Sequence, residues 1–268
     1  MSSGGRRAGP GVVPPFAAVM AAIAGISYSS FLLESLLSPD LDVIDGYASE
    51  LSAVDQPFHW AYNAGDYITG WLTIIVSVTA LVTLRRRPWA SAGWTFLLLF
   101  GISVLGDATF PLDCAPSLDT TCALRERADH VSFSHQFHAV TSGSVIACAI
   151  IALFALSIAA RRYGWWPALA RWGWALAIAE VVSALTTLCL MVAGAWLGLA
   201  QRIQIIVLSL SLLTIAWALY ADRRDRGRGA TIPAGAPEAP SRPAQPYEPP
   251  EPAEVRAQQP IPPSGAKP

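Results

Sequence analysis

Residues 136–160 read QFHAVTSGSVIACAIIALFALSIAA and are followed at once by Arg161 and Arg162. The stretch holds no charged side chain, and most of it is alanine, isoleucine, leucine and valine. A helix of about 20 apolar residues crosses the roughly 30 Å hydrocarbon layer of a membrane and satisfies its own backbone hydrogen bonds. The stretch therefore predicts a transmembrane helix that ends at a basic cluster.

The same pattern recurs along the chain. Hydrophobic residues make up 53% of the sequence and charged residues 14%, which is too apolar for a soluble domain of this length. We expect an all-α fold, a polytopic membrane protein built as a six-transmembrane-helix bundle. The predicted spans are residues 15–37, 66–84, 92–110, 136–160, 172–194 and 201–221.

Most arginines lie in four clusters that alternate with acidic loops between the spans; Arg125, Arg127 and Arg202 are exceptions within the first 228 residues. Because arginine is retained on the cytoplasmic side, we expect both termini inside and the loops 38–65 and 111–135 outside. A single lysine beside many arginines and alanines is typical of a GC-rich bacterial genome. These features predict a multi-pass protein of the bacterial cytoplasmic (inner) membrane. The clusters are Arg6-Arg7, Arg85-Arg86-Arg87, Arg161-Arg162 with Arg171, and Arg223-Arg224 with Arg226 and Arg228.

The regions outside the spans have a different composition. We expect residues 1–14 to form a disordered cytoplasmic N-terminus and residues 222–268 a proline-rich, disordered cytoplasmic tail, because the tail cannot bury enough apolar surface to offset the entropy lost on ordering. The net charge is −1. It argues against nucleic acid as a partner, since phosphate binding needs a net basic surface.

Two cysteines lie in the second predicted outer loop. Cys114 and Cys122 are separated by a short segment that contains Pro116, and outside the cytosol such a pair is expected to oxidise to a disulfide. A zinc site is the alternative, although the pair lacks the CxxC spacing of zinc ribbons.

Histidines gather at the entrance to the fourth span. The three-residue step from His135 to His138 puts both rings on one helix face. Asp107 and Asp113 would complete a set of two histidines and one carboxylate with one open position, the arrangement that activates water on zinc. A divalent transition metal is therefore one candidate cofactor. Structural hydrogen bonding and an acid–base or pH-sensing role are the alternatives.

Carboxylates also occur within the spans, where a charge is costly and must find a partner. Glu34, Asp107 and Glu180 are such groups, and Arg202, near Gln204 at the outer start of the sixth span, is a candidate partner for Glu34 and Asp107. Two interpretations stay open: a buried polar network that fixes helix packing, or a polar cavity open to the outside. The segment Ser49–Ser52, which contains Glu50, can start a short helix through a serine cap and form a lid over the bundle.

Three stretches resemble a known family. They are SELSAVDQPFHWAYNAGDYITG at 49–70, FPLDC at 110–114 and HQFH at 135–138. They resemble an uncharacterised bacterial membrane family, domain of unknown function 998, and the resemblance covers about residues 15–221. It implies about six helices and carries no settled activity. By that resemblance, the positions of interest are Ser49, Glu50, Asn63, Pro111, Asp113, His135 and His138.

The function that these features favour is binding or handling of a small molecule or a lipid headgroup in an outward-facing polar cavity. Membrane lipid and a small-molecule ligand are the expected partners. One alternative is a membrane-embedded, metal-dependent hydrolase that acts on a lipid through His135, His138 and an aspartate, and another is a structural or sensory scaffold. The sequence contains no glycine-rich phosphate loop, GxSxG or HExxH motif, which favours a protein that is not an enzyme.

Overall fold

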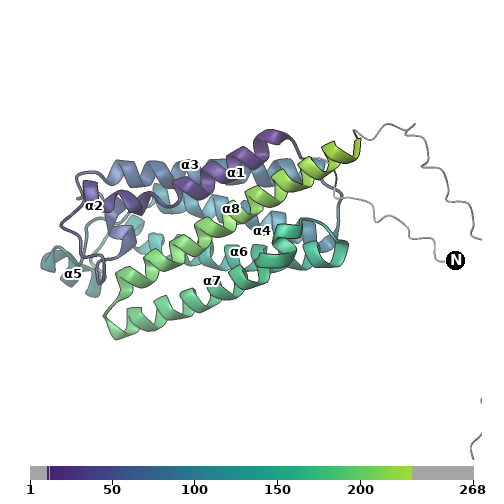
Figure 1. Cartoon of the computed structure of the whole chain (residues 1–268). Coiled ribbons are helices and arrows are strands. Elements are labelled where there is room, and N and C mark those ends of the chain that lie inside the picture. Colours follow the sequence, from purple (N-terminus) through teal and green to yellow (C-terminus); the bar gives the residue numbers. More distant parts are fainter. Residues whose placement is uncertain (1–10, 12, 231–268) are drawn as a thin grey trace, which may run out of the picture. The chain divides into compact units, whose positions relative to one another are not determined.

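The computed structural model describes residue 11 and residues 13–230, with side chains up to Arg224. Five long apolar helices in this part could each cross a membrane, and a bent helix pair makes a sixth span. The prediction of an all-helical protein with up to six spans is confirmed (Figure 1). The elements are α1 (Pro15–Ser27), η1 (Ser30–Leu33), α2 (Glu34–Leu37), η2 (Ala48–Ser52), α3 (His59–Thr83), α4 (Pro88–Thr109), α5 (Thr120–Arg127), α6 (Phe133–Tyr163), α7 (Pro167–Ala193) and α8 (Leu197–Ala230).

Local sequence signals account for where the long helices begin and end. Helices α1, α4 and α7 each have a proline in the first turn, where its missing N–H costs no hydrogen bond. The Ser132 side chain caps α6 by accepting from the backbone N–H of His135. Gly164 and Gly194 end α6 and α7 in the left-handed conformation that glycine adopts without strain.

The first predicted span, over 15–37, is present as a bent pair of helices and not as one continuous helix. Helix α1 ends at Ser27, and the η1 and α2 segment leaves it at an angle of 48°. The break coincides with a polar run, Ser27 to Ser30, whose hydroxyls compete with helical hydrogen bonding. One of them, Ser29 Oγ, donates to Ser209 Oγ of α8 at 2.8 Å. At the break, the first span is therefore hydrogen-bonded to α8.

Two other boundaries differ from expectation. Helix α3 begins at His59, inside the region expected to be loop, and α8 continues to Ala230. Residues 222–230 of the predicted tail are therefore helical. The rest of that tail and most of the predicted N-terminal segment lie outside the described residues.

The spans form a closed ring in which each packs on its neighbour in sequence and α1 packs on α8. The apolar core inside this ring includes Trp94, Phe100, Leu156 and Ile215. Helices α3 and α4 approach closely at Gly70 and Gly101, where an added Cβ on either residue would lie 2.9 Å from the other's carbonyl oxygen. The ring topology brings polar residues from six different helices to one end.

The two ends of the bundle differ in composition. The basic end is made by the α3–α4 and α6–α7 connections, where Arg87 lies 5.6 Å from the ring centre of Tyr163. The loop end carries η1, α2, η2 and α5 (Figure 1). Consecutive spans run in opposite directions between the two ends, as the arginine clusters predict.

Candidate functional site

A cavity of about 140 Å³ opens at the loop end of the ring. Residues from the end of α1, η1, η2, α3, α4, α6 and α8 line it, so it forms only when the ring closes. Its lining mixes hydroxyl, amide, carboxylate, imidazole and aromatic groups with aliphatic ones. The residues are Tyr28, Ser30, Phe31, Ala48, Ser49, Leu51, Ser52, Tyr62, Asp66, Asp107, His138, Ser142, Val145, Ile146, Gln201, Gln204, Ile205 and Leu208.

The short helix η2 forms one wall of this cavity. The predicted short helix at 49–52 is present and lines the cavity, but no serine side chain caps it, and its N-cap residue is Tyr47. The side chain of Ser52 instead donates to the carbonyl of Ser49 at 2.8 Å. The backbone N–H of Ala48 donates to Gln201 Oε1 of α8 at 2.8 Å, which ties the segment to the ring.

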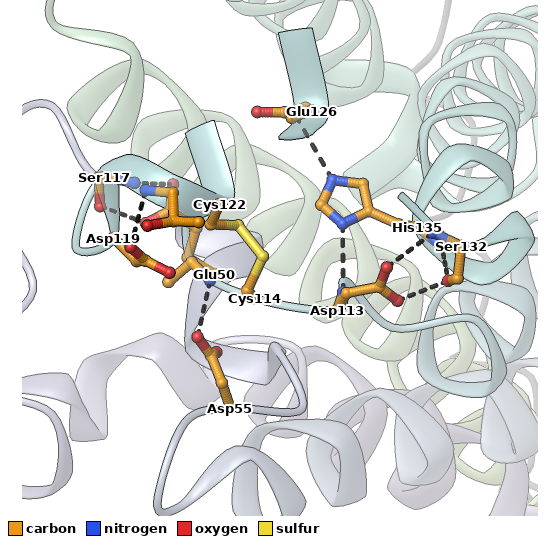
Figure 2. Close-up of a disulfide and its surroundings, with 12 residues drawn as sticks. Glu50, Asp55, Asp113, Cys114, Ser117, Asp119, Cys122, Glu126, Ser132 and His135 are labelled. Atoms are coloured by element: carbon orange, nitrogen blue, oxygen red, sulfur yellow. Dashed lines mark hydrogen bonds and ion pairs between the residues drawn. A yellow bond between two sulfur atoms is a disulfide. The ribbon is translucent and has the colours of Figure 1, made fainter. Parts of the chain in front are cut away.

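Glu50 points away from the cavity into the second loop, where it is fully buried. It accepts hydrogen bonds from the backbone N–H of Ser117, at 3.3 Å, and from the Ser117 hydroxyl (Figure 2). Burial raises the pKa of the Glu50 carboxyl, although the Ser117 hydrogen bonds act in the opposite direction. Next to it, Asp55 accepts from the backbone N–H of Ala115 at 3.2 Å. These contacts join the two loops.

A disulfide between Cys114 and Cys122 holds the second loop in this conformation. Both cysteines are buried, and their Cα atoms lie 6.1 Å apart. The bond attaches α5 to the segment that follows α4, and Ser117 lies inside the closed loop (Figure 2). The disulfide therefore helps to position the hydroxyl that contacts Glu50.

Asp113 and His135 make a second cluster beside the disulfide (Figure 2). Asp113 accepts from the backbone N–H of Ser132 at 2.7 Å and from its hydroxyl at 2.5 Å. Burial alone would raise the pKa of the Asp113 carboxyl, but the Ser132 hydrogen bonds and the nearby His135 and Arg125 hold it below its ordinary value. The backbone N–H of Asp113 donates to His135 Nδ1 at 3.2 Å, so this nitrogen carries the ring's lone pair.

His138 is part of the cavity wall, and its Nδ1 donates a hydrogen bond where Nδ1 of His135 accepts one. Its Nδ1 lies 3.0 Å from the carbonyl oxygen of Phe110, which can only accept, so Nδ1 donates. The same nitrogen lies 3.8 Å from Asp107 Oδ1. Asp107 also accepts from the hydroxyls of Thr141 and, at 3.0 Å, Ser142. His138 Nε2 is buried and has no hydrogen-bond partner in the described part of the chain.

The structure separates the predicted metal ligands. His135 pairs with Asp113, and Nε2 of that ring lies 3.5 Å from Glu126, whereas His138 pairs with Asp107. No group of three or more metal-ligating side chains comes together among the described residues. The two-histidine, one-carboxylate arrangement is therefore not formed, because the His135 lone pair is already used by a backbone N–H.

Arg202 pairs with one of its two candidate partners. Its Nε lies 2.9 Å from both oxygens of Glu34, Nη2 also contacts Glu34, and Nη1 donates to the Gly46 carbonyl at 2.9 Å. Glu34 and Arg202 are both buried, whereas Asp107 belongs to the cavity wall instead. The bent first span creates this pairing, since it carries Glu34 to α8.

Of the three other predicted site residues, Gln204, Glu180 and Asn63, only Gln204 lines the cavity. Gln204 lines the cavity and donates at 3.1 Å to Glu180 Oε1, while Glu180 Oε2 is buried without a hydrogen bond in the described region. Asn63 is half-buried and lies outside the cavity lining. Sequence reasoning overlooked Asp66, the second carboxylate of the cavity. The available signal was that Asp66 is a carboxylate within the predicted span 66–84, three residues after Asn63.

The comparisons with known proteins concern the whole bundle. A family model described as "Protein of unknown function (DUF998)" matches residues 21–218. No curated protein and no solved structure matches the chain. The matched region includes the two loops, the cavity and nearly all of the six spans, as the resemblance at 49–70, 110–114 and 135–138 predicts. The chain therefore belongs to this family of proteins of unknown function, DUF998.

Proposed function

We propose that this protein binds a small molecule or a lipid headgroup in the cavity at the loop end. The observation that carries the proposal is a polar cavity at the end of an apolar ring, lined by groups from seven separate elements. Ligand sites are concave and combine apolar walls with a few converging polar groups. Tyr28, at the break of the first span, is among these groups, and broken spans place such groups in the binding sites of many membrane proteins.

The orientation follows from the charges at the two ends. The basic end carries the arginine clusters of two connections, and arginine-rich connections face the cytoplasm. The loop end would then face the outside of the bacterial cytoplasmic membrane. A disulfide between Cys114 and Cys122 fits this assignment, because disulfides persist in oxidising compartments.

Binding accounts for the interior better than ion conduction does. Val145 and Leu208 line the inner part of the cavity, and beyond them the core cluster contains Phe100, Val104 and Leu212. These residues are apolar and buried. A conducted ion would lose its hydration there without replacement. We therefore place the function at the loop end.

The first test measures access to the cavity from outside. Ser49 lines the cavity, and its hydroxyl makes no hydrogen bond in the described part of the chain. In a background with Cys148→Ser and Cys189→Ser, Ser49→Cys should react in intact cells with a small, membrane-impermeant thiosulfonate. Ser91→Cys, near the basic end, should react only after the membrane is opened. The proposal would be contradicted if, in intact cells, the Ser49→Cys thiol stays unreactive while the Ser91→Cys thiol reacts.

The second test identifies what the cavity retains. Ser142→Leu should fill part of the cavity, whereas Ser144→Leu makes the same change at a half-buried position outside the cavity lining, two residues further along α6. Mass spectrometry of purified protein should find a small molecule or lipid that is lost from Ser142→Leu and kept by wild type and Ser144→Leu. Identical contents in all three proteins would count against a binding cavity.

A further inference from the structure

The charges around the cavity have one sign. Asp66 of α3 and Asp107 of α4 both line it, and these two helices pack directly on each other. No arginine or lysine belongs to the lining. Arg202, between the lining residues Gln201 and Gln204 in sequence, is not part of the lining and is paired with Glu34 and with the Gly46 carbonyl. Two carboxylates without a countercharge are costly in a low-dielectric setting, and a bound cation would offset this cost.

Asp66 is also short of hydrogen-bond donors. Asp107 accepts from Thr141 and Ser142, but Asp66 makes no hydrogen bond or ion pair within residues 13–224. His138 Nε2, in the same wall, is a buried nitrogen without a partner in that region. Because His138 Nδ1 donates to Phe110, the neutral ring offers a lone pair at Nε2. The cavity thus presents acceptors that lack donors.

The remaining walls favour a cation as well. Helix α1 ends at the cavity, where its cap residue Tyr28 is part of the lining, and the carbonyl end of a helix carries partial negative charge. The aromatic side chains of Tyr28, Phe31 and Tyr62 line the cavity. Aromatic faces attract organic cations such as alkylammonium groups.

Size and donor type distinguish an organic cation from a metal ion. The described residues form no group of three metal-ligating side chains, here or elsewhere. A cavity volume of about 140 Å³ is roughly ten times the space that one water molecule needs. It therefore has room for a small organic cation, such as an ammonium on a two-carbon chain.

We infer that the ligand of this cavity is a small ammonium group, supplied by a free amine or by the ethanolamine headgroup of a membrane lipid. The inference rests on the proposed function and names its ligand class. The ammonium would lie between Asp66 and Asp107 and donate to them and to His138 Nε2. The short carbon chain would contact the aromatic side chains.

Charge selectivity tests this inference without a known ligand. Ser49→Cys in the background with Cys148→Ser and Cys189→Ser should react with a cationic thiosulfonate about 10-fold or more faster than with an anionic one of similar size, because an acidic cleft concentrates cations. Val54→Cys, 55% exposed on the same loop, should show much less preference. Asp66→Asn should bring the Ser49→Cys ratio close to that of Val54→Cys. Asp40→Asn, an exposed carboxylate of the same loop, should leave it unchanged.

Occupancy then separates the two sources of the ammonium group. Free ethanolamine should protect Ser49→Cys from modification, and ethylene glycol, which lacks the charge, should not. Protection in phosphatidylethanolamine vesicles but not in phosphatidylglycerol vesicles would assign the lipid headgroup, whereas protection by free ethanolamine alone would assign a soluble amine. Equal reaction rates for both reagents and no protection by ethanolamine would overturn the inference. The proposed function would survive that result, because the thiol would still be accessible from outside.

Discussion

Breaking the ion pair between Glu34 and Arg202 should destabilise the whole bundle. Arg202 is 3% exposed and Glu34 8%. In Arg202→Met, the Glu34 carboxylate loses both Nε contacts, at 2.9 Å, and the Nη2 contact, and the Gly46 carbonyl loses its side-chain donor. Removing one member of a buried pair leaves an uncompensated charge, which costs about 3–5 kcal/mol. For a chain of this size the cost corresponds to roughly 6–20 °C in Tm.

The assay is thermal unfolding of purified protein in detergent, followed by tryptophan fluorescence. The double variant Glu34→Leu/Arg202→Met should recover about 2 kcal/mol of the loss, because it leaves no unpaired charge. The unsatisfied Gly46 carbonyl should retain a cost of about 1–3 kcal/mol. Arg125→Met, at an exposed arginine of α5, is the matched control and should change stability by less than about 0.5 kcal/mol.

Two results would refute this reasoning. If Arg202→Met costs no more than Arg125→Met, the pair contributes nothing to stability. If the double variant loses the sum of both single losses, the two side chains act independently and the buried charge is not the cause. A thermodynamic cycle built from wild type, Glu34→Leu, Arg202→Met and the double variant measures that coupling directly.

The other predictions concern the loop end. Gly198→Ala should destabilise the protein by more than about 1 kcal/mol, because its Cβ would lie 2.1 Å from the Gly46 carbonyl oxygen, whereas Gly143→Ala meets nothing within 4 Å and should be neutral or stabilising by about 0.5–1 kcal/mol; Tm values of both variants check this. Burial raises the pKa of Glu50, so the folded protein keeps a proton that the unfolded chain releases above about pH 4.3. Stability should therefore fall as pH rises from there through the folded pKa, and Glu50→Gln should flatten that part of a plot of Tm against pH; an unchanged slope would exclude Glu50 as its source. Replacing Cys122 by alanine should lower stability by about 2–3 kcal/mol, and a reducing agent should lower the Tm of wild type but not of Cys122→Ala.

The chain's local pattern was enough to predict the spans. Charge-free apolar stretches and arginine clusters predict crossing segments and their alternation, because hydrocarbon thickness and the cost of moving arginine act on each segment separately. The α3 boundary was misplaced because residues 59–65, although helical, are mostly polar or small and lie at the loop end. The pairing of Glu34 with Arg202 was among the sequence expectations, since few charges occur at that depth.

The partners of the remaining polar groups were decided by tertiary structure. Spacing puts His135 and His138 on one face of α6, yet the path of residues 110–113 gives one ring a backbone N–H and the other a carbonyl. The break in the first span, and the meeting of Asp66 with Asp107, likewise depend on which helices become neighbours when the ring closes. Hydrophobic length is a property of each segment, so the sequence determined the spans by itself. A cavity and its hydrogen bonds are properties of several segments at once, so only the packed ring could decide them.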